Sequence, residues 1–135
     1  FRSYTVSGGA ITVSQTVTQC VVGLPYTARF KSMKIGSPTQ DVSQVLSHYK
    51  NINHIGFVMA NTHSKGLRYG PDFDVLDALP QNERGVTVGE QVYDQYDEQT
   101  IEFPGTWNTD ARVCLQAQAP RPCTLLALDL ALEMP

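Results

Sequence analysis

The chain has 135 residues and carries ten basic and thirteen acidic side chains, which give a formal net charge of −3. A chain of this length can bury a hydrophobic core without help from metal or disulfide, so we expect one β-rich domain over residues 1–135. The mildly negative net charge argues against sequence-independent binding of nucleic acid, which requires a basic patch. No stretch of about 18 consecutive apolar residues occurs, so no membrane insertion is expected.

The N-terminal stretch has the alternation of β-strands. Residues 2–7 read as a strand that ends at Gly8 and Gly9, two residues that tolerate the positive φ of a tight turn. A half-buried antiparallel strand is predicted next, because hydroxyl side chains at positions 12, 14, 16 and 18 alternate with an apolar face made of Ile11, Val13, Val17 and Val21.

A Gly-Leu-Pro-Tyr corner at residues 23–26 joins two apparent strands within residues 20–35. Pro25 lacks an amide donor and pushes Leu24 into an extended conformation, so the corner is predicted to be a β element with Val22 in the core. Beyond it the apolar parity switches from Ala28 and Phe30 to residues 33 and 35, which predicts a bulge near residues 31–32.

The middle of the chain alternates between clear and ambiguous patterns. Residues 38–49 have helical spacing after Pro38, and a short helix and an extended arm or loop are both compatible with them. Residues 51–61 are apolar on both faces and predict a central strand. Residues 62–72 are dense in turn formers and predict a long structured loop, and residues 73–79 predict at most one helical turn.

The last third predicts further strands at residues 86–93, 101–103, 111–117 and 126–134. For the final segment a strand is preferred over a helix, because a helix would place Asp129 on the apolar stripe. Seven or so strands at this spacing indicate an all-β, mainly antiparallel fold. We therefore expect a sandwich or barrel-like domain with long loops and at most one or two short helices.

No pattern of reactive side chains predicts catalysis, a metal or a cofactor. His48, His54 and His63 are spaced too widely for a familiar zinc motif. The acidic residues at positions 72, 74 and 77 resemble the start of a calcium loop, but the sixth position holds Asp77 where glycine is required. The carboxylates at positions 94, 97, 98 and 102 are predicted to lie at a solvated hairpin tip.

Three cysteines form neither a CxxC pair nor an even framework. Free thiols are therefore expected for Cys20, Cys114 and Cys123, with pairing of Cys114 and Cys123 across a hairpin as the alternative.

Several short motifs occur in an order that resembles the C-terminal part of a family of bacteriophage virion proteins, the tail nozzle or tail tubular protein B of short-tailed phages. They span nearly the whole chain and are Val22-Gly23-Leu24-Pro25-Tyr26-Thr27, Asn61-Thr62, Gly66-Leu67-Arg68-Tyr69-Gly70, Phe103-Pro104-Gly105, and Gln118-Ala119-Pro120 through Pro122 with Thr124-Leu125-Leu126-Ala127. Each motif is a turn or the start of a strand, so their order carries the resemblance.

The resemblance implies a structural protein of the phage tail, made in the host cytoplasm and located in the virion. Its implied partners are copies of itself in a hexameric ring, the tail adaptor, and fibre or spike proteins, with phage DNA passing transiently through the ring. Family members are longer, so the chain is expected to be a C-terminal portion. The alternatives are a carbohydrate-binding β-sandwich for host attachment and, third, an enzyme such as a cell-wall hydrolase.

Loops carry recognition more often than sheets do, which directs the search for contact residues to the predicted loops and turns. Contacts with neighbouring subunits are expected in the loop of residues 62–70 and at the tip of residues 93–102. A lone tryptophan in a turn is a further candidate, either as an interface residue or as a sugar-stacking platform. The candidates are Arg68, Tyr69, Tyr93, Tyr96 and Trp107.

Overall fold

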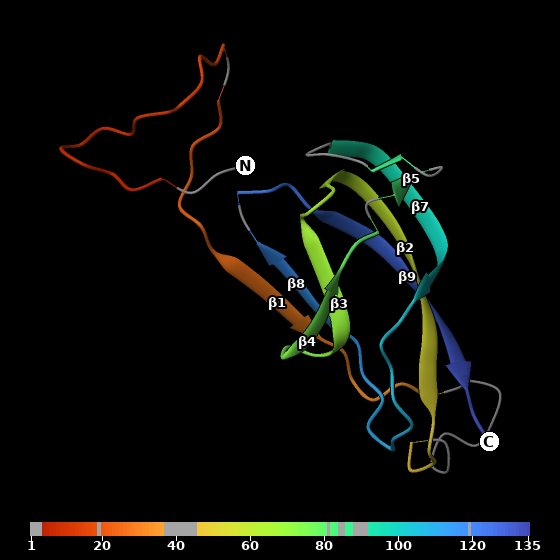
Figure 1. Ribbon diagram of the computed structural model, residues 1–135. Helices are drawn as coiled ribbons and strands as arrows, with labels where there is room; N and C mark the ends of the chain where they lie inside the picture. Colours follow the sequence, from red (N-terminus) through yellow and green to blue (C-terminus); the bar gives the residue numbers. More distant parts are fainter. Residues whose placement is uncertain are drawn as a thin grey trace.

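The structure is a computed structural model that describes residues 4–18, 20–36, 46–80, 82–83, 86–87, 92–118 and 120–135. At residues 82–83, 86–87 and 96–99 it describes the backbone alone. Within these residues the fold is all-β, with no helix, as Figure 1 shows. The predicted all-β fold class is therefore confirmed.

The described residues form nine strands in three antiparallel sheets. One sheet has four strands in the order β1-β8-β3-β4, the second has three in the order β7-β2-β9, and β5 pairs only with β6. The strands are β1 (Thr27–Lys31), β2 (Asn51–His63), β3 (Leu67–Asp72), β4 (Val75–Ala78), β5 (Asn82–Glu83), β6 (Val86–Thr87), β7 (Val92–Glu102), β8 (Cys114–Gln118) and β9 (Thr124–Glu133).

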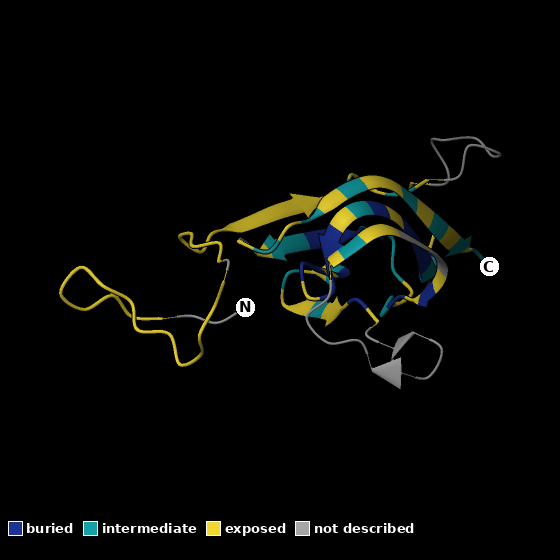
Figure 2. Ribbon diagram, turned by 90° about the horizontal axis from the view of Figure 1, so that it is seen from above, coloured by how far each residue is buried: buried dark blue, intermediate teal, exposed yellow. Residues whose placement is uncertain are grey.

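The hydrophobic core lies between the four-stranded and the three-stranded sheets, which pack as a sandwich (Figure 2). Apolar residues alternate along β2, β3 and β8, so one face of each strand turns inward while the other meets solvent. The buried set is Ile52, Ile55, Phe57, Met59, Leu67, Tyr69, Leu79, Ile101, Phe103, Ala111, Val113 and Leu115.

Strand β2 is the centre of its sheet, as its apolar composition predicts. It pairs with β7 on one side and β9 on the other, and Phe57 and Met59 are almost completely buried. Its register against β9 shifts between Val58 and Met59. Because a one-residue shift reverses the facing of the side chains, Leu126 on β9 points outward and is 64% exposed. The prediction of a final strand is confirmed by β9, and the strand predicted at residues 111–117 is confirmed from Cys114 onward, where β8 begins.

Three predictions for the middle of the chain are wrong. Residues 62–72 do not form a long loop, because β2 continues to His63, a turn follows, and β3 begins at Leu67. Residues 73–79 form no helical turn and instead return as β4 along β3. Residues 93–102 are not a hairpin tip but most of the long strand β7, which also contains the strand predicted at Ile101. Backbone pairing with β2 outweighs the polar side chains in β7.

The predicted turn at Gly8 and Gly9 is confirmed, with positive φ at both residues, but the strands predicted on either side of it are wrong for the described residues. Residues 4–18 and 20–26 belong to an arm that projects from the start of β1 and bends along its length (Figure 1), and every described residue in it is exposed. Its only strand-like pairing among the described residues joins Ser7 to Ala10 around a Gly8-Gly9 turn. Val22 is 72% exposed, so it lies outside the core. An alternating strand pattern buries its apolar face only where another sheet opposes it, and none does so here.

Residues 32–35 continue the edge of the four-stranded sheet after β1 ends. The Ser32 amide donates to the Val113 carbonyl at 2.9 Å, and the Ile35 amide donates to the Ala111 carbonyl at 3.0 Å. This spacing carries Ile35 onto the core while Met33 stays 84% exposed. The question of a helix at residues 38–49 falls mostly on residues 37–45, which lie outside the described residues.

Candidate interaction surface

The five predicted contact residues do not come together on one surface. Arg68 lies on β3 and Tyr93 on β7, in different sheets. Trp107 is 47% exposed in the loop that follows β7. The backbone of Tyr96 lies within β7, and its side chain is outside the described part of the chain. Tyr69, the fifth, belongs to the core.

Tyr69 is only 4% exposed and fills the space between the two sheets. Its ring meets the ring of Phe57 edge to face at 5.3 Å between centroids and lies 6.2 Å from that of Phe103. Its hydroxyl donates to the carbonyl of Glu102 at 3.2 Å, and burial raises the pKa of the phenol. These contacts assign Tyr69 a packing role, and it offers no surface to a neighbouring molecule in this conformation.

The outer face of the four-stranded sheet is polar. The Arg29 guanidinium donates to Gln116 at 2.9 Å and lies over the Phe73 ring, 4.9 Å from its centroid. Lys31 forms a 3.1 Å ion pair with Asp72, and this hydrogen-bonded contact raises the pKa of Lys31 and lowers that of Asp72. A hydrogen bond from Arg29 thus ties β1 to β8, and an ion pair ties β1 to the end of β3, across an exposed face.

Arg68 contributes to the same outer face. Its guanidinium donates to the carbonyl of Leu76 on β4 at 2.8 Å and so spans the β3–β4 hairpin. The exposed remainder of this side chain is accessible to a partner, whereas the hydrogen bond fixes its direction.

The three histidines lie in different settings. His48 is exposed, His54 is half-buried on β2, and His63 is buried at the end of β2, where its Nδ1 accepts the amide of Lys65 at 3.0 Å. Across the described residues no three histidine, cysteine, aspartate or glutamate side chains gather in a way that would hold a metal ion. The three cysteines are free thiols, so Cys114 and Cys123 are not paired.

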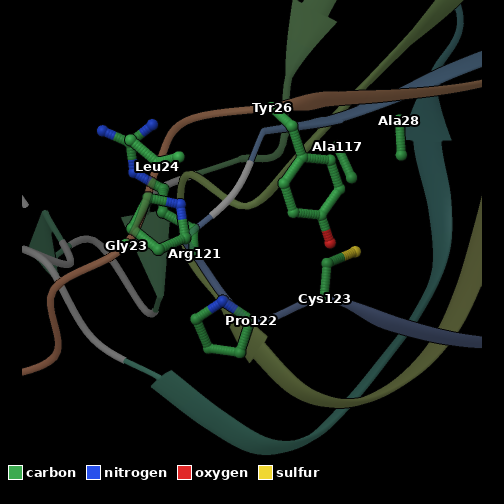
Figure 3. A pocket seen from close by; sticks show the side chains of 9 residues that line it. Gly23, Leu24, Tyr26, Ala28, Ala117, Arg121, Pro122 and Cys123 are labelled. Atoms are coloured by element: carbon green, nitrogen blue, oxygen red, sulfur yellow. The ribbon is translucent and has the colours of Figure 1, made fainter.

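A hollow of about 410 Å³ opens where the arm meets the body. Tyr26 points toward Cys123 across it, and Arg121 stands at its rim (Figure 3). Burial raises the pKa of the Cys123 thiol. The hollow lies between the arm, the edge strands β1 and β8, and the segment that leads into β9, because its other lining residues are Gly23, Leu24, Ala28, Ala117, Pro120 and Pro122.

The hollow marks the open side of the sandwich, which is the side where β1 lies. Ala28 and Phe30 pair with Ala117 and Leu115, so they share the inner face of the sheet with buried residues. Phe30 is nevertheless 53% exposed. Since Tyr69 on β3 packs against β2, the three-stranded sheet covers β3 and β8 and ends at β9. In the described structure no strand lies opposite β1.

The arm is the feature whose significance the sequence did not reveal. The alternation of its side chains is visible in the sequence, and it was interpreted there as a strand buried within the same chain. In the structure the apolar face of this segment is exposed, with Val13 46% exposed and Val17 49% exposed. This exposure distinguishes a projecting arm from a strand buried within the same chain.

The comparisons with known proteins add no relative. No protein-family model matches the chain, and no curated protein matches it significantly. Nor do the described residues include a helix with the length and apolar character needed to cross a membrane. Functional inference therefore rests on the motifs and the geometry described above.

Proposed function

We propose that the chain is a structural module of a short-tailed phage tail, part of a nozzle or tubular protein that forms a ring-shaped conduit for DNA ejection. The observation that carries this proposal is the ordered set of motifs shared with that family. The proposal includes assembly of the full-length protein as a hexamer, contact with the tail adaptor and with fibre or spike proteins, and a location in the virion.

The positions of the motifs in the fold support the proposal. Residues 22–27 lead into β1, residues 66–70 form the start of β3, and residues 103–105 follow β7. A Cβ atom at Gly70 would collide with the carbonyl oxygen of Val75, and one at Gly105 would collide with that of Ile52. These glycines permit close backbone approach, so the motifs are structural requirements of this fold rather than parts of a reactive site.

The surface chemistry is compatible with a wall past which DNA moves. The chain carries a net charge of −3, and the exposed cations Lys31 and Lys34 lie within reach of Asp72 and Asp110 respectively. Lysines paired with carboxylates, in a chain of net negative charge, hold phosphates weakly, which favours DNA that moves past over DNA that is retained.

Quantitative mass spectrometry of fractionated phage particles tests the proposal. Peptides of this sequence should appear in the tail fraction, in a copy number that is a multiple of six and in fixed ratio to the adaptor. Their absence from the particle, or their presence in the capsid fraction alone, would contradict the tail assignment.

Carbohydrate binding is the second candidate, favoured by the half-exposed Trp107 beside the polar side chains of Asn108 and Asp110. A glycan array tests it directly. Specific binding that is lost in Trp107→Ala and kept in Leu126→Ala, which removes an apolar side chain from another surface, would support attachment to a host saccharide.

A further inference from the structure

We propose that the arm of one copy, through its described residues 10–18 and 20–22, binds the open side of a second copy as a strand added beside β9. This inference goes beyond the tail proposal and does not depend on it, because it uses only the arm, the free strand edges and the uncovered inner face. The recognition mode is β-strand addition, in which main-chain hydrogen bonds supply affinity and alternate side chains supply specificity.

The receiving surface lacks a strand opposite β1. The four-stranded sheet presents β1 at its edge, whereas the three-stranded sheet stops at β9. The inner face of β1 is consequently open, with Phe30 53% exposed. Within the described residues the outer edge of β9 has no neighbouring strand, so its backbone donors and acceptors are available to one. A fourth strand at that edge would lie opposite β1 and cover Phe30.

The arm has the side-chain pattern that such a strand requires. Ile11, Val13, Val17 and Val21 lie on one face, and the other face is mostly hydroxyl-bearing. A strand at the edge of a sandwich buries one face and exposes the other to solvent, and the apolar and hydroxyl-bearing faces of the arm match this requirement. Residues 11–22 would span about 40 Å at roughly 3.3 Å per residue, enough to follow the whole of β9.

The arm is directed away from its own body. Residues 20–26 contain no turn, and Leu24 precedes Pro25, which favours an extended backbone. Residues 20–26 therefore carry the chain outward from β1 without the reversal next to β1 that the arm would need in order to reach its own β9. Because the arm leaves beside its own hollow, two copies can exchange arms reciprocally through one symmetric contact. In a reciprocal exchange each copy contributes its 13-residue arm segment together with its receiving edge, which approaches the roughly 20–30 residues that each partner contributes to a standard interface.

The test uses the intact 135-residue chain in sedimentation equilibrium over a dilution series. The expected mass is at least twice the monomer value of 14.9 kDa at high concentration, with dissociation on dilution. The double variant Val13→Asp with Val17→Asp charges the apolar face and should sediment as a monomer. The matched control Thr12→Asp with Thr16→Asp adds the same charge to the hydroxyl face and should still self-associate.

Two further measurements make the outcome decisive. Phe30→Asp alters the receiving face and should also abolish association, while circular dichroism verifies that the fold is kept. A synthetic peptide of residues 4–22 in excess should dissociate the assembly, whereas the same peptide with Asp at positions 13 and 17 should not. A wild-type chain that stays monomeric with its arm protected from protease would show binding to its own body and overturn the proposal. Equal loss of association in both double variants would overturn it as well.

Discussion

Phe57 and Phe30 both lie on the inner faces of their strands, yet Phe57 is 1% exposed and Phe30 is 53% exposed. Phe57 is on β2 at the centre of one sheet, with the Tyr69 ring of the other sheet against it. Phe30 is on the edge strand β1, beyond the reach of the opposing sheet. Two side chains with the same local pattern therefore make very different contributions to stability, because burial requires a second layer.

The two sides of the sandwich are held by different forces. The closed side, around β2, β3 and β7, is stabilised by apolar burial. The open side, where β1 pairs with β8, is held by backbone hydrogen bonds and by polar contacts such as those of Arg29 with Gln116 and of Lys31 with Asp72. Mutations and pH should act differently on the two sides.

Phe57→Ala should have the largest effect. Truncating a fully buried phenylalanine costs about 3–5 kcal/mol in free energy of unfolding, a large part of the roughly 5–15 kcal/mol that holds a domain together. Urea denaturation followed by circular dichroism measures it. The control Phe30→Ala should cost only about 1 kcal/mol, because half of that side chain already meets water. Equal losses in the two variants would remove the distinction between the closed and open sides.

Gly70→Ala should rank second. The added Cβ would collide with the carbonyl oxygen of Val75, so the β3–β4 hairpin must shift, at a cost of about 1–3 kcal/mol. Gly23→Ala is the matched control on the open side, where the nearest atom is the Pro120 Cβ at 3.4 Å. The melting temperature should fall for the first variant and stay close to wild type for the second.

Asp72→Asn should have a smaller, pH-dependent effect on β1. The lowered pKa of Asp72 gives a contribution that is present above its unfolded pKa and lost as pH falls through the folded value. The raised pKa of Lys31 gives one that is present below the unfolded value and lost as pH rises through the folded value. The stability difference between wild type and Asp72→Asn should therefore be greatest at neutral pH and shrink below about pH 4 and above about pH 10.

Urea midpoints across the pH range provide the measurement for the Lys31–Asp72 pair. Asp74→Asn removes the same charge two residues away and serves as the control. A difference that stays constant from acid to alkaline pH would show that the ion pair does not contribute.

Val22→Asp should have the smallest effect on the monomer. Val22 is 72% exposed at the base of the arm, and exposed substitutions usually change the free energy of unfolding by less than about 0.5 kcal/mol. The strand pattern alone predicts unfolding for this variant, so its melting temperature separates the two interpretations. A melting transition lowered by many degrees would place the corner in the core after all.

The sequence predicted most reliably those strands whose side chains report burial directly. β2, β9 and the approach to β8 are rich in apolar residues at strand spacing, and all were identified. β7 was mistaken for a solvated tip because residues 94–98 are polar, and polar residues are common on edge strands, where they discourage unwanted pairing. The β2–β3 hairpin was missed because Gly66, Gly70 and Pro71 suggested a loop, although Gly70 and Pro71 lie within β3.

The candidate surface was harder to predict than the fold. The sequence places Tyr69 in a loop and therefore makes it a candidate contact residue. Tyr69 is buried because it lies on β3, a strand that the local sequence did not favour. For the arm, the apolar face was identified correctly but its surroundings were not. Periodicity identifies an apolar face, but it contains no information about which sheet, or which molecule, covers that face.

The connection between the arm and β1 has a mechanical consequence. Tension on the arm enters β1 at Thr27, and β1 is joined to β8 by an antiparallel ladder of five residue pairs. Hydrogen bonds in such a ladder run perpendicular to the strands, so a pull along β1 loads all of them in shear at once. Lateral contacts at Arg29 and Lys31 would resist the same displacement. A short strand at an exposed edge can thus serve as a force-bearing anchor.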